Sequence, residues 1–214
     1  MVAESDTRGG SLKRLARTSE EAKNILALTS PSESLSWMAF DATKTNAERS
    51  ELAGFKMVHF ATHGVVDPDH PALSGIVFSL YDRQGQSVDG FLRLNEVFNL
   101  KLPVDLVVLS ACQSGQGKLI RGEGLVGLSR GFLYAGAASL VVSLWSVDDE
   151  ATAELMSRFY AKMLGTEHLR PAAALRVAQL SMLSDPNQRW KQPLYWAPFI
   201  VQGDWRCPGC GQIP

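Results

Sequence analysis

One histidine and one cysteine each stand where an apolar run gives way to turn-forming residues. Cys112 follows the apolar run 104–109, and His63 follows the run 55–61 and directly precedes Gly64. A cysteine nucleophile reacts as the thiolate, and a nearby imidazole lowers the thiol pKa and can protonate a leaving amine. Backbone N–H groups around Gly64 and at Cys112 could stabilise the oxyanion formed in acyl transfer. The pair therefore indicates acyl-transfer chemistry with a cysteine nucleophile and a histidine base.

Three other histidines compete for the role of base. His59 lies in the middle of an apolar run, which predicts a core or second-layer position. His70 lies in a proline-flanked turn, and His168 lies in a connection between two predicted helices. Only His63 stands at the end of a predicted strand beside a glycine, so we take it as the candidate base.

The elements that must position these residues are predicted strands that alternate with helices. Short runs rich in β-branched residues suit strands that are covered on both faces, as in a parallel sheet. Alternation predicts an α/β fold with a mainly parallel sheet and helices on both faces, in which ligands collect where strands end. The two strands that lead to the reactive pair could be neighbours. The strands are predicted at residues 34–40, 55–61, 73–81, 104–109, 139–144 and 199–201, and the helices at 18–26, 41–52, 94–100, 125–134, 148–164 and 171–183.

Composition limits the classes of function. The chain has 214 residues, 45% of them hydrophobic, which is enough for a sizeable core. A net charge of −1 without a basic block does not indicate nucleic acid or an anionic membrane as a partner. No apolar run reaches the length of a bilayer span and no signal-peptide pattern opens the chain, so we expect a cytoplasmic protein.

The three cysteines do not form a disulfide framework. Cys207 and Cys210 have half of a zinc-ribbon spacing, but a structural zinc site needs four ligands. We interpret them as exposed tail cysteines, the alternative being a zinc site shared with a missing segment or a second chain. We expect no metal and no other cofactor.

A glycine pattern, Gly122-Glu-Gly124-Leu-Val-Gly127, matches the dinucleotide-binding fingerprint. A true fingerprint follows its strand directly, whereas here the cysteine loop separates it from Leu109. We interpret the pattern as a loop and the close-packed start of a helix. A further hypothesis is that residues 118–124 form an activation or processing loop beside the reactive cysteine.

Several ordered motifs together resemble the CHAT family, whose members are caspase-like domains related to caspases, separases and metacaspases. The resemblance covers residues 18–205, with residues 1–17 as a flexible N-terminal segment or remnant of a longer chain and 206–214 as a tail. It implies a caspase-haemoglobinase fold, a three-layer α/β sandwich, and a cysteine endopeptidase that works through a thioester acyl-enzyme. The motifs are His59-Phe-Ala-Thr-His-Gly64, Leu73-Ser-Gly75, Leu109-Ser-Ala-Cys-Gln-Ser-Gly115, Arg121-Gly-Glu-Gly124, Ser143-Leu-Trp145 and Asp148-Asp149.

The resemblance assigns roles to individual residues. It implies His63 as the base and Cys112 as the nucleophile, without a third member. The segment with Trp145 and Asp148 corresponds to the wall where such enzymes dock an extended substrate, although Asp148 is equally well placed to cap a helix. Arginine-specific relatives often carry an acid two residues before the nucleophile. Here that residue is Ser110, so a strict preference for a basic residue is not expected.

Two functions follow from these observations. The first is a cysteine endopeptidase that cleaves protein substrates, implied by the resemblance to be a regulated effector in a bacterial response pathway. The second is a non-catalytic caspase-like protein-interaction module. The family also commonly accompanies helical repeats of the tetratricopeptide type, which sense a partner. No such repeat occurs in this sequence, so we expect an isolated effector domain or a fragment.

Overall fold

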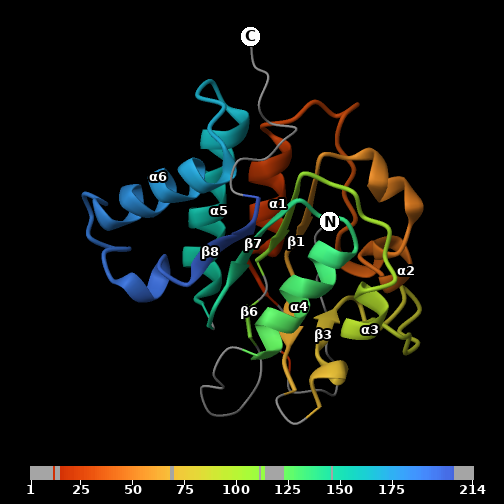
Figure 1. The fold of residues 1–214 in the computed structure, drawn as a ribbon. Helices are drawn as coiled ribbons and strands as arrows, with labels where there is room; N and C mark the ends of the chain where they lie inside the picture. Colours follow the sequence, from red (N-terminus) through yellow and green to blue (C-terminus); the bar gives the residue numbers. More distant parts are fainter. Residues whose placement is uncertain are drawn as a thin grey trace.

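A computed structural model describes Leu12 and residues 15–67, 70–110, 112–113, 123–145 and 147–204. In this part of the chain, strands and helices alternate in a mixed α/β arrangement with two four-stranded sheets (Figure 1). The helices of this part are too short or too polar to span a bilayer.

The larger sheet confirms the predicted, mainly parallel arrangement. Its order is β1 (Met57–Phe60), β5 (Leu106–Leu109), β7 (Ser139–Ser143) and β8 (Phe199–Gly203). The first three strands run parallel, and β8 pairs with β7 in the antiparallel direction. Every residue of β5 and β7 is buried, which explains why these strands appear in the sequence as continuous apolar runs.

Helices cover both faces of this sheet. Side chains alternate along a strand, so Val107 and Leu109 pack with α4 (Glu123–Tyr134) while Leu106 and Val108 pack on the opposite side. That opposite side is covered by α5 (Asp149–Leu164) and α6 (Pro171–Leu183), which pack against each other (Figure 1). Pro171 opens α6, at a position where its missing N–H costs least.

The smaller sheet extends the two central strands. Its order is β4 (Phe91–Arg93), β3 (Gly75–Val77), β2 (His63–Val65) and β6 (Cys112–Gln113). β2 follows two residues after β1, and β6 follows two residues after β5, so the parallel pair continues into this sheet. β3 and β4 add to it in the antiparallel direction, an extension that the sequence did not predict.

The segment before β1 differs from its prediction. A strand over residues 34–40 is wrong, because Ala39 has a φ of +52°, which is incompatible with an extended strand. The single helix predicted over residues 41–52 is also wrong, because Arg49 takes an extended conformation and interrupts it. The shorter elements are α1 (Thr18–Leu26), η1 (Ala39–Asp41), α2 (Lys44–Ala47), η2 (Ser50–Gly54), η3 (Pro71–Leu73), α3 (Leu94–Val97) and η4 (Pro193–Tyr195).

Candidate active site at the ends of the central strands

The register of the two central strands brings the predicted reactive residues side by side. In the larger sheet, Phe60 pairs with Leu109, and in the smaller sheet His63 pairs with Cys112. The sequence offset between partners is the same in both pairs, so the register passes through the bend without an inserted residue. Neighbouring strands lie about 4.8 Å apart. The expectation that these residues come from adjacent strands is therefore confirmed.

His63 lies on a defined face of the smaller sheet. Its other neighbour is Val77 of β3, whereas Gly64 pairs with Ile76. Ile76 belongs to the core cluster on the α4 side, so alternation places His63 on the opposite face. The Thr62 hydroxyl donates to the carbonyl of Val77 and holds the bend between β1 and β2. The His63 residue is 3% exposed, so its imidazole lies in a largely dry environment.

Gly75 allows β3 to support this arrangement. A Cβ atom at Gly75 would lie 2.3 Å from the carbonyl oxygen of Leu92 in β4, a distance that no side chain tolerates. The close approach lets β3 pair with β4 on one edge and with β2 on the other. The Leu-Ser-Gly motif thus has a structural role next to the strand of His63.

A buried polar cluster lies at the base of the two strand extensions. The Nδ1 atom of His59 is 3.0 Å from the Tyr160 hydroxyl, and its Nε2 atom is 3.1 Å from Oγ of Ser110. The same Nε2 atom lies 3.0 Å from a carboxylate oxygen of Glu21. All four residues are buried, so the predicted second-layer position of His59 agrees with its surroundings. Burial first, and then the charge of Glu21, raises the pKa of Tyr160, which keeps its phenol protonated.

The other candidate substrate contacts lie in separate places. Ser110 is buried against His59, while Trp145 is half-buried just after β7. Asp148 is exposed and caps α5, with its Oδ1 atom accepting a hydrogen bond of 2.9 Å from the backbone N–H of Ala151. The next residue, Asp149, has a raised pKa because it is half-buried and lies near other carboxylates.

Two predictions cannot be compared with the structure. Cys207 and Cys210, and residues 118–122 of the proposed activation loop, lie outside the described residues. The end of the glycine pattern does open α4, as the interpretation of a helix start requires. Among the described residues, no three His, Cys, Asp or Glu side chains gather as metal ligands would.

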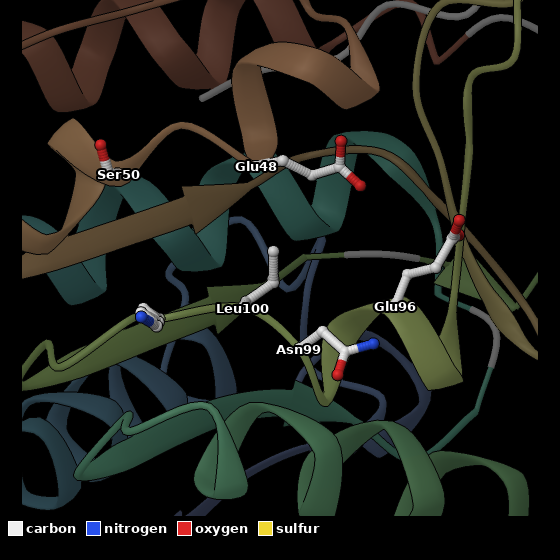
Figure 2. Close-up of a pocket in the computed structure, with 6 residues that line it drawn as sticks. Glu48, Ser50, Glu96, Asn99 and Leu100 are labelled. Atoms are coloured by element: carbon white, nitrogen blue, oxygen red, sulfur yellow. The ribbon is translucent and has the colours of Figure 1, made fainter.

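A pocket of about 350 Å³ lies away from the reactive pair. It opens between η2 and the chain that follows α3, and Figure 2 shows the carboxylates of Glu48 and Glu96 on its wall. Glu96 is already paired with Lys44 at 2.7 Å. The pocket includes neither His63 nor Cys112 in its lining. The remaining lining residues are Ser50, Asn99, Leu100 and Lys101.

Sequence reasoning missed Glu21 and Tyr160. Glu21 lies 38 residues before His59 in the sequence, and Tyr160 lies 101 residues after it. In the sequence, Glu21 reads only as an acid in the first turn of a helix, and Tyr160 reads only as part of an amphipathic pattern. The contact depends on how α1 and α5 pack, and local sequence carries no signal for that packing.

Comparison with known proteins identifies the family of this chain. The family model described as "CHAT domain" matches residues 1–204. The chain is also 36% identical over 108 residues to tetratricopeptide repeat protein 28 of Homo sapiens, a match covering 50% of this chain and 4% of the relative. The protein of the same name in Mus musculus is 35% identical over 108 residues, with the same coverage. The chain thus spans only a small part of the length of these relatives. The family match covers nearly the whole chain, and the chain belongs to the CHAT domain family.

Proposed function

We propose that this chain is a caspase-like cysteine endopeptidase with a three-layer sandwich fold, in which His63 is the base and Cys112 the nucleophile. The observation that carries the proposal is the in-register pairing of these two residues on neighbouring parallel strands. The pair lies just past the ends of β1 and β5, where α/β folds place their reactive groups. Membership in the CHAT domain family supports the same reading.

In the proposed reaction, the imidazole of His63 accepts the proton of the Cys112 thiol. The thiolate attacks the carbonyl carbon of the scissile peptide bond, and backbone N–H groups at Gly64 and Cys112 stabilise the oxyanion. The tetrahedral species then breaks its C–N bond, and the imidazolium protonates the departing amine. A water molecule, deprotonated by His63, hydrolyses the thioester and restores the thiol.

The substrate is proposed to bind as an extended strand along β6. In the larger sheet, β5 lies between β1 and β7, whereas β6, which continues β5, pairs only with β2 in the described part of the chain. The edge of β6 on the β7 side is where a peptide could add by backbone hydrogen bonds. Trp145 and Asp148 follow β7 on that side and would form the wall.

Ser110 is proposed to shape the pocket for the substrate residue before the scissile bond. Its hydroxyl lies against His59, and it brings no charge of its own to that pocket. A strict preference for a basic residue is therefore not proposed.

The biological setting is proposed from the relatives and the composition. The matched relatives are named as tetratricopeptide repeat proteins, which supports a helical-repeat domain or partner as the regulator of the peptidase. A cytoplasmic location is proposed together with that role.

The second candidate is a non-catalytic protein-interaction module. The burial of His63, at 3% exposed, favours it, because a base must be reached by the substrate. In that case the thiol of Cys112 would have no enhanced reactivity.

Selective alkylation separates the two functions. We expect iodoacetamide to modify Cys112 faster than Cys207 or Cys210, as read by peptide mapping, and His63→Ala to remove the difference. His63→Ala should also lower cleavage of a peptide library about 10²- to 10⁴-fold, the usual contribution of a general base. The matched control is His70→Ala, since the side chain of His70 is 72% exposed outside the site. Equal alkylation of all three cysteines, unchanged in His63→Ala, contradicts the peptidase proposal.

A further inference from the structure

The buried cluster around His59 joins both strands of the reactive pair. His59 lies on β1, four residues before His63, and Ser110 follows β5, two residues before Cys112. The contact of 3.1 Å between them ties the two strands together near their ends, before the bend. His59 is about 13 Å along the chain from His63, at 3.3 Å per residue, so it acts through the strands and not on the substrate.

The partners of His59 fix the orientation of its ring. The Nε2 atom makes its hydrogen bond with Oγ of Ser110 at 3.1 Å and lies 3.0 Å from a carboxylate oxygen of Glu21, which has no hydrogen-bond partner of its own among the described residues. The Tyr160 phenol, which stays protonated, can donate to Nδ1 at 3.0 Å. Partners on both nitrogens hold a histidine ring in one orientation.

Glu21 reaches this cluster from helix α1. It is 2% exposed, whereas Glu20 beside it is exposed. The helix packs against α5, where Asn24 donates to the hydroxyl of Ser157 at 3.1 Å. The backbone N–H of Arg17 donates to Asp149 at 2.8 Å. The seating of α1 on α5 thus decides whether the Glu21 carboxylate reaches the base of the strands.

We propose that Glu21 and His59 are positioning residues through which the seating of α1 holds the strand ends that carry His63 and Cys112 in reactive alignment. The inference rests on the proposed peptidase function. A buried carboxylate is costly unless it is paired, and Glu21 lies 3.0 Å from Nε2 of His59. Displacing α1 removes this contact, frees the ring of His59 and loosens its contact with Ser110.

The test compares two replacements of similar size at one position. Glu21→Gln keeps a polar side chain of the same shape beside Nε2, whereas Glu21→Met fills the same space with an apolar one. The readout is the rate of Cys112 alkylation by iodoacetamide as a function of pH, measured by peptide mapping well below the unfolding temperature of each variant. Glu20→Met, an exposed change on the same helix, is the control.

We expect Glu21→Met to slow alkylation of Cys112 about tenfold at about pH 6, because a misaligned imidazole raises the thiol pKa by about one unit. Glu21→Gln and Glu20→Met should match the parent protein. Tyr160→Phe, which removes only a hydroxyl, should also slow alkylation of Cys112. It replaces Glu21→Met in the test if that variant does not fold.

The outcomes separate the inference from the function on which it rests. Fast, His63-dependent alkylation that Glu21→Met and Tyr160→Phe leave unchanged overturns the inference and keeps the peptidase. The inference also fails if Glu21→Gln slows alkylation as much as Glu21→Met, because the polar contact with Nε2 is then not what matters. Alkylation of Cys112 that is slow and independent of His63 in the parent protein overturns both.

Discussion

Asp148 caps a helix and is also proposed to contact the substrate. One of its carboxylate oxygens caps α5 through the N–H of Ala151, and the residue is exposed just beyond Trp145. The cap could be predicted from the sequence, because Asp148 precedes two more acids at the start of an amphipathic segment. Its contact with a substrate stays a proposal. The two roles can be separated, because capping needs only a short side chain with an acceptor.

The first prediction uses that difference at Asp148. Asp148→Ala should lower the free energy of unfolding by about 1 kcal/mol, the usual cost of a lost N-cap. Asp148→Ser keeps a capping oxygen and should retain most of that stability while it removes the charge. Chemical denaturation gives the stability, and a peptide library gives the cleavage preference. A preference that changes in Asp148→Ser without a loss of stability supports substrate contact. An unchanged preference in both variants leaves Asp148 as a cap alone.

At the scale of elements, the long periodic segments could be predicted and the short ones could not. β5, β7, α5 and α6 lie where the sequence places them, because their apolar patterns are long enough to identify. β4 was missed, and the predicted strand 73–81 shortens to β3, because a strand of three residues carries too little pattern. β3 forms by pairing with β2, and β4 forms by pairing with β3, and local sequence carries no signal for either pairing.

Lys44 links the two short helices α2 and α3 through an ion pair. Its ammonium on α2 lies 2.7 Å from Glu96 on α3 and 3.0 Å from Asp89. The hydrogen bond to Lys44 lowers the pKa of Asp89. Burial alone would raise the pKa of Glu96, but Lys44 and the N–H of Arg93 outweigh it, so the pKa of Glu96 is also lowered. The pKa of Lys44 is raised in turn, chiefly by its hydrogen bond to Glu96.

The second prediction follows from the direction of these shifts. Carboxylates with a lowered pKa in the folded state stabilise the protein above their unfolded pKa, and that stability is lost as the pH falls toward the folded pKa. Lys44→Met should therefore cost about 1 kcal/mol at neutral pH and reduce the loss of stability on acidification below about pH 5. Thermal unfolding at a series of pH values measures this difference in stability, with Lys23→Met on α1 as the exposed control. Parallel curves of stability against pH for Lys44→Met and the parent would contradict the role of Lys44 in lowering the pKa values of Asp89 and Glu96.

For the whole molecule, the candidate site depends on a register that runs through two sheets. The sequence predicted the residue types and the strand ends, and the resemblance assigned their roles. The sequence did not predict the bend at Thr62, the antiparallel pairing of β3 with β2 or the cluster of Glu21, His59, Ser110 and Tyr160 beneath the pair. Each of these joins segments far apart in the chain. Among the described residues no strand pairs with β6 on the β7 side, and the proposed substrate would complete the sheet there.

The last prediction tests that completion with a cleavable peptide methylated at one backbone nitrogen at a time. A peptide that adds to β6 as a strand directs every second N–H toward that edge, so methylation at alternate positions should lower kcat/KM about fivefold, for about 1 kcal/mol per lost hydrogen bond. Methylation at the positions between should have little effect, and a position well outside the bound segment is the control. Binding to Cys112→Ala should weaken with the same period of two, because the hydrogen bonds precede the chemistry. A profile without that period would mean that side chains alone hold the substrate and that β6 gains no strand.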